Sequence, residues 1–169
     1  FIADAVSRMQ LAGNGCFTQN CQEWLEKMFG SVQALLTHSG TAALEMASLL
    51  IDTKPGDEII MPSFTFVTTA SSFVLRGAMP VFVDIRPDTL NIDEKLIESA
   101  ITKKTKAIVP VHYAGVSCDM STIMEIARCA GSFVIEDAAH GILANWNGKP
   151  VGSQGDLAAL SFHETKNVI

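Results

Sequence analysis

The sequence predicts an α/β fold in which a mostly parallel β-sheet carries helices on both faces. Two observations lead to this prediction: short apolar runs alternate with amphipathic helical segments, and the links between them are short. Repeated β-α-β units of this kind place successive strands parallel to one another. With 169 residues, 48% of them hydrophobic, the chain is long enough to bury one substantial core.

The expected elements follow one another in a regular order. A helix is expected at Gln19–Phe29, where apolar residues share one face and Gly30 provides a stop. A second helix at Gly40–Ile51 consists of good helix formers and is closed by the turn at Lys54–Asp57. The helix at Asp93–Ile101 is expected to begin at an N-cap, either Asn91 or Asp93. The other expected helices are Phe66–Leu75 and Asp119–Ala130, and the expected strands are Gln33–Leu36, Glu58–Met61, Pro80–Asp84, Lys106–Val111, Phe133–Glu136 and Ala158–Phe162.

Charge and composition exclude several classes of protein. The balance of 12 basic against 18 acidic residues gives a net charge of −6, which argues against nucleic-acid and anionic-membrane partners. No apolar run approaches the ~18 residues of a membrane span, and the first residues do not resemble a signal peptide. The four cysteines have no zinc-site spacing and are expected to be ordinary thiols. We therefore expect a cytoplasmic protein without a metal site.

The chain is expected to be part of a longer protein. It begins with Phe1 rather than methionine, and it stops three residues after Lys166. A stop at that point would leave the loop that carries the lysine without a following element to anchor it. We expect residues 1–169 to hold an N-terminal segment and part of one large domain, and to be inactive alone.

Two residues indicate a specific cofactor chemistry. Lys166 follows the expected strand at Ala158–Phe162, and Asp137 follows the strand at Phe133–Glu136. A lysine can bind an aldehyde cofactor covalently, and a buried carboxylate can hold a pyridine nitrogen protonated. Pyridoxal 5′-phosphate needs both groups, and ligands of parallel sheets bind where the carboxyl ends of the strands meet.

A third segment provides a place for the phosphate of that cofactor. Gly40 and Thr41 open a helix, where free N–H groups and the helix dipole favour an anion. Taken singly, such residues are usually only caps, turn residues or surface charges, and the joint pattern is what favours a site. The motifs of nucleotide-binding P-loops, dinucleotide-binding folds, serine hydrolases and zinc proteases do not occur in the chain.

Seven short motifs together resemble the DegT/DnrJ/StrS family of sugar aminotransferases, which use pyridoxal phosphate. The resemblance extends over nearly the whole chain and implies the large domain of the aspartate aminotransferase-like fold, fold type I, with three α/β/α layers. The motifs are Ser39–Leu44, Pro55–Glu58, Met61–Phe66, Phe82–Asp84, Asn91–Asp93, Glu136–Gly141 and Ser161–Asn167.

The resemblance implies a role for each matching residue. Lys166 matches the lysine that binds the cofactor covalently, and Asp137 matches the carboxylate that pairs with the pyridine nitrogen. His140 matches the residue on the side of the phenolic oxygen. The phosphate is expected to be bound by Gly40, Thr41 and Ser161, and the ring is expected to stack on Phe66.

The resemblance also implies a reaction and partners. An amino acid, with glutamate expected, would give its amino group to a nucleotide-linked keto sugar, and the complete protein would be a homodimer. The segments Val111–Val116 and Ser161–Asn167 most resemble the branch that makes dTDP-4-amino-4,6-dideoxygalactose for enterobacterial common antigen. Two alternatives stay open: an aminotransferase of the same family with another sugar nucleotide, and a non-catalytic α/β binding domain.

Overall fold

The computed structural model describes residues 1–30 and 33–166. The chain divides into two compact units, Phe1–Leu36 and Thr37–Ile169, which are described separately. In the part that the structure describes, no helix is both long enough and apolar enough to cross a membrane.

The first unit contains two helices, α1 (Ile2–Ser7) and α2 (Cys16–Phe29). The predicted helix at Gln19–Phe29 is confirmed, but it begins one turn earlier, after the extended backbone of Gly15. It ends at Gly30, whose left-handed backbone (φ 62°) is the conformation that glycine adopts most easily.

The strand predicted at Gln33–Leu36 is wrong, because these residues form no regular element. The N–H of Ala34 donates to Glu26 Oε1 (2.9 Å) rather than to a neighbouring strand. Leu35 and Leu36 are exposed, so this apolar run does not enter a sheet. An apolar run of four residues becomes a strand only when a partner strand satisfies its backbone.

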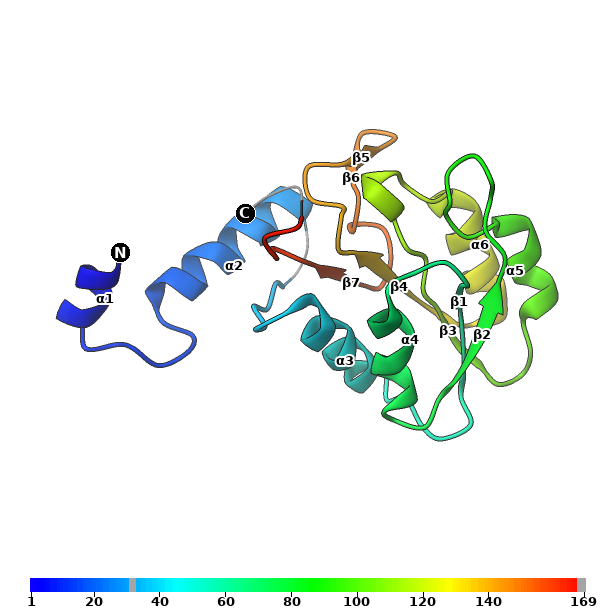
Figure 1. Cartoon of the computed structure of the whole chain (residues 1–169), viewed down its shortest axis with the longest axis horizontal. Helices are drawn as coiled ribbons and strands as arrows, with labels where there is room; N and C mark the ends of the chain where they lie inside the picture. The colour runs from blue at the N-terminus through cyan, green and yellow to red at the C-terminus, as the bar shows by residue number, and fades with distance from the viewer. Residues whose placement is uncertain (31–32, 167–169) are drawn as a thin grey trace. The chain divides into compact units, whose positions relative to one another are not determined.

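The second unit is built on a five-stranded sheet in which every neighbouring pair is parallel. The strand order is β2-β1-β3-β4-β7 (Figure 1). The strands are β1 (Glu58–Pro62), β2 (Met79–Val83), β3 (Thr105–Ile108), β4 (Phe133–Ala138) and β7 (Leu157–Leu160). The predicted parallel α/β fold is therefore confirmed, with strand bounds that differ from the predicted ones by up to three residues.

Helices cover both faces of this sheet (Figure 1). On one face, α3 (Gly40–Leu50) and α4 (Val67–Val74) enclose a core that includes Met61 and Ile135. On the other, α5 (Glu94–Ala100) and α6 (Met120–Ala130) enclose a core that includes Ile60 and Val134. Adjacent residues of β1 and β4 thus enter opposite cores, as the alternation of side chains along a strand requires.

Side-chain caps fix where three of these helices begin. Ser39 Oγ accepts from the N–H of Ala42 at the start of α3, and Asp119 caps α6 in the same way. Asp93 is the N-cap of α5, which decides between the two residues that the sequence offered. Each such cap satisfies a helix N–H that would otherwise have no partner.

Two smaller elements lie in the connections. A short 3₁₀ helix, η1 (Tyr113–Gly115), follows β3 and precedes α6. The connection from β4 to β7 contains the hairpin of β5 (Asn145–Trp146) and β6 (Lys149–Pro150). Its two turn residues, Asn147 and Gly148, both have positive φ (49° and 80°), as a two-residue hairpin turn requires.

Candidate active site

Asp137 lies at the carboxyl end of β4 and is almost completely buried (5% exposed). Its Oδ2 accepts a hydrogen bond from Thr69 Oγ1 on α4 (2.6 Å), and its Oδ1 accepts from the N–H of Ala139 (3.2 Å). The hydroxyl of Thr69 is in turn 2.8 Å from that of Thr65. A buried carboxylate is thus held in one orientation by a short chain of hydroxyl groups.

Lys166 lies beside His140, with 2.9 Å between Lys166 Nζ and His140 Nε2. The other ring nitrogen, His140 Nδ1, accepts a hydrogen bond from the N–H of Ala114 (3.2 Å). A neutral imidazole has one donor and one acceptor, so accepting at Nδ1 places its proton on Nε2. The amine of Lys166, a group that can bind an aldehyde covalently, thus lies directly against the imidazole ring.

The loop of η1 fixes the position of His140. Ala114 and Gly115 both have positive φ (52° and 81°), which turns the N–H of Ala114 toward the imidazole. The ring of Tyr113 packs edge-on against that of His140, and Phe64 packs against Tyr113. Burial lowers the pKa of His140, and the positive charge of Lys166 lowers it further, against an opposing effect of Asp137. The neutral ring is therefore favoured.

Gly40 and Ser161 form a narrow cradle at the N-terminus of α3. A Cβ at Gly40 would lie 3.2 Å from Ser161 Cβ, closer than most such contacts, so a side chain at this position would crowd the serine. Among the described residues, the N–H groups of Gly40 and Thr41 have no hydrogen-bond partner. Two N–H groups, a hydroxyl and a helix N-terminus together fit a phosphate group.

Phe66 immediately precedes α4, on which Thr69 contacts Asp137. The N–H of Thr69 donates to the carbonyl of Phe66 (3.0 Å), and the Phe66 ring is 71% exposed. Phe66 thus lies one helical turn before the residue that contacts Asp137, and its exposed ring is free to stack on a planar ligand. That Phe66 does so stays a prediction.

The structure thus brings the predicted site residues to one end of the sheet of the second unit. Lys166 contacts His140 directly, Gly40 adjoins Ser161, and Ser161 and Lys166 belong to one loop after β7. The sequence prediction placed the phosphate-binding segment after a strand, and the structure has no strand there. The N-terminus of α3 nevertheless lies at this end of the sheet. The last residue of the predicted Ser161–Asn167 motif lies outside the described residues.

Sequence reasoning did not identify several residues that the structure adds to the site. Thr69 orients Asp137, and Ala114 sets the tautomer of His140. Neither residue has a local signal, because each meets its partner only after folding. Glu136 and His112 form a further buried pair, and an ionisable residue in the otherwise apolar predicted strand Phe133–Glu136 was a signal for it.

Residues 2–169 match the DegT/DnrJ/EryC1/StrS aminotransferase family, and the chain belongs to this family. It is 46% identical over 139 residues to the spore coat polysaccharide biosynthesis protein SpsC of Bacillus subtilis, covering 82% of this chain and 36% of that protein. It is 39% identical to the GDP-perosamine synthase of Caulobacter vibrioides, covering 98% of this chain and 45% of that enzyme. The chain thus spans less than half the length of these relatives.

Solved structures agree with the family assignment. A family aminotransferase from Brucella abortus superposes with a TM-score of 0.92 at 32% identity, covering 98% of this chain and 46% of that one. A Streptococcus pneumoniae protein in its pyridoxal phosphate form superposes with a TM-score of 0.88 at 31% identity, covering 99% and 47%. The predicted aminotransferase fold is confirmed, and the predicted cofactor is confirmed at the level of the family and its solved structures.

Proposed function

We propose that this chain is the cofactor-binding part of a longer aminotransferase that binds pyridoxal 5′-phosphate through Lys166. The observation that carries the proposal is the Lys166–His140 contact of 2.9 Å, with Asp137 held at the end of β4 and the cradle of Gly40 and Ser161 in the same unit. One aldehyde cofactor with a pyridine nitrogen and a phosphate would use all three groups. The residues present therefore fit this cofactor.

Each of these residues has a separable role in the proposed reaction. When bound, pyridoxal phosphate supplies an electron-accepting ring that stabilises negative charge on the substrate carbon. Asp137 keeps a proton on the pyridine nitrogen, because Thr69 and the N–H of Ala139 hold the carboxylate in place. Lys166 Nζ would hold the cofactor at its aldehyde carbon, with the aldehyde oxygen leaving as water. Once the amino group of the substrate replaces it there, the free Lys166 amine would carry a proton to and from the substrate carbon.

The remaining residues bind and orient. Gly40, Thr41 and Ser161 hold the phosphate, which fixes the ring relative to Lys166. His140 lies next to the lysine on the side where the phenolic oxygen of the cofactor is expected, and its Nε2–H is available as a donor. Phe66 covers one face of the ring.

The amino acceptor in this proposal is a nucleotide-linked 4-keto-6-deoxy sugar, and the donor is an amino acid, with glutamate expected. Relatives named for spore coat polysaccharide biosynthesis and GDP-perosamine synthesis support a sugar substrate. The finer proposal is that the product is dTDP-4-amino-4,6-dideoxygalactose for enterobacterial common antigen. It rests on the resemblance of Val111–Val116 and Ser161–Asn167 to that branch of the family.

The proposal also includes the parts of the protein beyond this chain. Residues 1–169 would be an N-terminal segment and part of the large domain, with a small C-terminal domain and a partner subunit completing the site. We therefore propose that the complete protein is a cytoplasmic homodimer and that these residues alone are inactive.

The experiment that tests the proposal uses the full-length protein loaded with pyridoxal phosphate, and glutamate is added only after the absorbance and borohydride measurements. We expect a visible absorbance band that borohydride bleaches, and a peptide in which the cofactor is fixed to Lys166. A panel of dTDP- and GDP-linked keto sugars then identifies the acceptor by the appearance of an amino sugar. A protein that folds but shows neither band nor product would be a binding domain, and the proposal would be wrong.

A further inference from the structure

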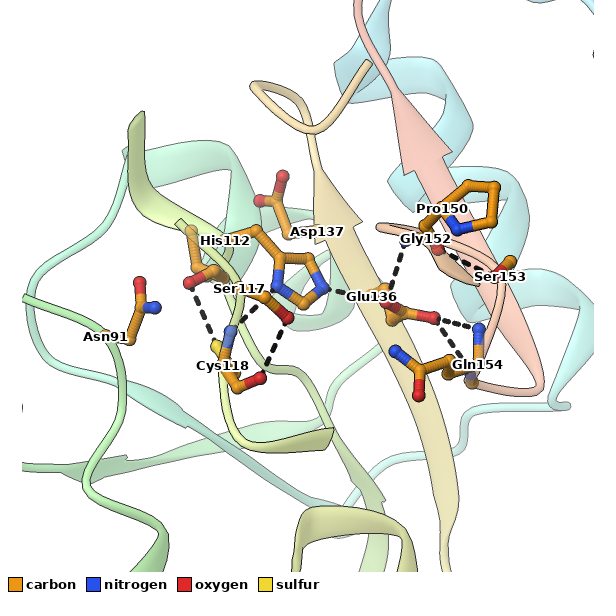
Figure 2. A network of polar contacts seen from close by, with 12 residues as sticks. Asn91, His112, Ser117, Cys118, Glu136, Asp137, Pro150, Gly152, Ser153 and Gln154 are labelled. Carbon is orange, nitrogen blue, oxygen red and sulfur yellow. Dashed lines mark hydrogen bonds and ion pairs between the residues drawn. The ribbon is translucent and has the colours of Figure 1, made fainter. Parts of the chain in front are cut away.

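Glu136 carries a completely buried carboxylate (0% exposed) that accepts four hydrogen bonds (Figure 2). Oε1 accepts from the N–H groups of Gln154 (2.7 Å) and Gly155 (2.6 Å). Oε2 accepts from the N–H of Gly152 (2.9 Å) and faces His112 Nε2 at 2.8 Å. Three of the four donors thus belong to one turn, residues 152–155, which leads into β7.

His112 is held in the tautomer that donates to Glu136. The N–H of Cys118 donates to His112 Nδ1 (3.1 Å), so the proton of the neutral ring lies on Nε2. Burial alone would raise the pKa of Glu136, but the hydrogen bonds from His112 and the turn outweigh it, and that pKa is lowered. The carboxylate is therefore charged and saturated at neutral pH.

The turn that Glu136 holds determines where β7 pairs with β4. After Gly155, Asp156 makes two hydrogen bonds with the backbone of Val134. The N–H of Asp156 donates to the carbonyl of Val134 (2.9 Å), and Asp156 Oδ2 accepts from the N–H of Val134 (2.8 Å). The strands then pair in register, with Asp137 opposite Ala159. The chain continues from β7 into the loop of Ser161 and Lys166, so the position of this turn sets the position of both residues.

The same network reaches Asp137 from the other side. The N–H of His112 donates to the carbonyl of Asp137 (3.1 Å), and the N–H of Asp137 donates to the carbonyl of Pro110 (2.9 Å). In Figure 2 the Asp137 side chain points away from the Glu136 carboxylate. Glu136 therefore contacts no reacting group, but its partners hold the backbone on which the site is built.

We propose that Glu136 is a positioning residue that, with His112, places Lys166 and Asp137 for covalent binding of the cofactor. This inference rests on the proposed function, because it presumes that Lys166 binds the cofactor. A neutral or apolar side chain at position 136 would leave up to four buried donors without an acceptor. The turn would then move, and Lys166 would move with it, because only β7 and its loop lie between them.

The test compares two histidine variants of the full-length protein that remove the same ring. A glutamine at position 112 keeps a donor near Nε2, so His112→Gln retains the bond to Glu136. An asparagine keeps only an acceptor oxygen near the position of Nδ1. His112→Asn therefore retains the hydrogen bond from the N–H of Cys118 and loses the one to Glu136. Glu136→Gln replaces one of the two acceptor oxygens with an NH2 group, so two of the four donors then face another donor. Glu94→Gln is the matched control, since Glu94 is a buried carboxylate of α5 that pairs with Arg86 (2.9 Å).

Three measurements are made at temperatures where every variant is folded. Hydrogen exchange of the Gly152, Gln154 and Gly155 amides, without cofactor, reports on the turn. Borohydride fixation at saturating pyridoxal phosphate gives the fraction of Lys166 that binds the cofactor, and steady-state kinetics gives kcat and KM.

We expect His112→Asn and Glu136→Gln to speed exchange of the three amides and to lower fixation at Lys166 and kcat by roughly 10- to 100-fold. We expect His112→Gln and Glu94→Gln to stay close to the wild type. Equal effects of the two histidine variants, or of Glu136→Gln and Glu94→Gln, would overturn the inference. A wild-type protein without a Lys166 adduct would instead refute the proposed function. If Glu136→Gln does not fold, the histidine pair alone decides.

Discussion

Two polar clusters lie on either side of β4, and they differ in how completely their hydrogen-bonding groups are used. The cluster around Glu136 is saturated, with four donors on two carboxylate oxygens and no exposure. The cluster around Asp137 and Lys166 is not. Asp137 accepts two hydrogen bonds, and the amine of Lys166 has one hydrogen-bond partner among the described residues, His140. The first N–H groups of α3 have no hydrogen-bond partner among the described residues.

This difference separates a scaffold from a site. A saturated buried network has no capacity left for a ligand, and its loss costs the desolvation of every group in it. An unsaturated cluster of a carboxylate, an amine and helix N–H groups keeps that capacity for a ligand. Glu136 and Asp137 are adjacent in β4, and their side chains point to opposite faces of the sheet. One therefore stabilises the scaffold, and the other remains free to bind a ligand.

The largest expected effect comes from removing the amine of the unsaturated cluster. Lys166→Ala in the full-length protein should abolish covalent cofactor binding and transamination, because it removes the amine that lies beside His140. The unfolding temperature should change little, since the residue that the Lys166 amine contacts in the described part of the chain, His140, is itself partly exposed. Lys149→Ala, which removes an exposed lysine of the hairpin, is the control and should keep full activity. An active Lys166→Ala enzyme that still forms a borohydride-reducible adduct would contradict the assignment.

Asp137→Asn should leave the fold and cofactor binding intact but lower turnover by orders of magnitude. An amide cannot hold the pyridinium charge, which the reaction needs. The hydroxyl chain can reverse to suit the amide, because Thr69 can accept from the asparagine and donate to Thr65. Stopped-flow kinetics with Glu94→Gln as a control measures the effect, and an unchanged rate would exclude this role for Asp137.

In the saturated cluster, the expected effect is on stability. A Cβ at Gly155 would lie 2.8 Å from the carbonyl oxygen of Val134, which belongs to the sheet backbone and cannot easily move. Gly155→Ala should therefore lower the free energy of unfolding by roughly 1–3 kcal/mol. Gly13→Ala, where nothing lies within 4 Å of the new Cβ, is the control for denaturant unfolding. Equal stability of the two variants would show that the turn accommodates a side chain.

The smallest effect is a dependence of stability on pH. The pKa of Glu136 in the folded protein lies below the ordinary glutamate value of 4.5. Its contribution to stability is therefore fully present above that value and is lost as the pH falls through the lowered pKa. Thermal unfolding measured downward from pH 5 should show a steeper loss in the wild type than in Glu136→Gln. Parallel curves would mean that Glu136 is not the group that titrates.

Most of the sheet could be predicted from the sequence, because local patterns carry the necessary information. Apolar runs such as that in β4 and capping residues such as Asp93 depend on near neighbours. The strand predicted at Gln33–Leu36 was wrong because its apolar pattern says nothing about whether a partner strand is present. Local sequence decides what a segment can form, and tertiary contacts decide what it does form.

The candidate site could likewise be predicted where local sequence and topology decide it, and not where tertiary contacts do. Residues that follow strands or open helices, such as Lys166, Asp137 and Gly40, could be placed at one end of the sheet from topology alone. The contact of Thr69 with Asp137 spans 68 positions of the chain, and no local pattern announces it. Tautomers were also beyond prediction, because the proton on His140 depends on the backbone of a loop that adopts positive φ.

The parallel pairing of β4 with β7 also has a consequence for the order of folding. Parallel neighbours cannot be joined by a tight turn, and here the connection contains the β5–β6 hairpin and the turn at 152–155. Pairing over so long a connection is slow, since loop closure precedes the contacts that stabilise it. Until then β4 is an unprotected sheet edge with a charged glutamate on one face, and the Lys166 loop has no fixed place. The ability to bind the cofactor therefore depends on the docking of β7, which also covers an edge of β4 that could otherwise pair with another chain.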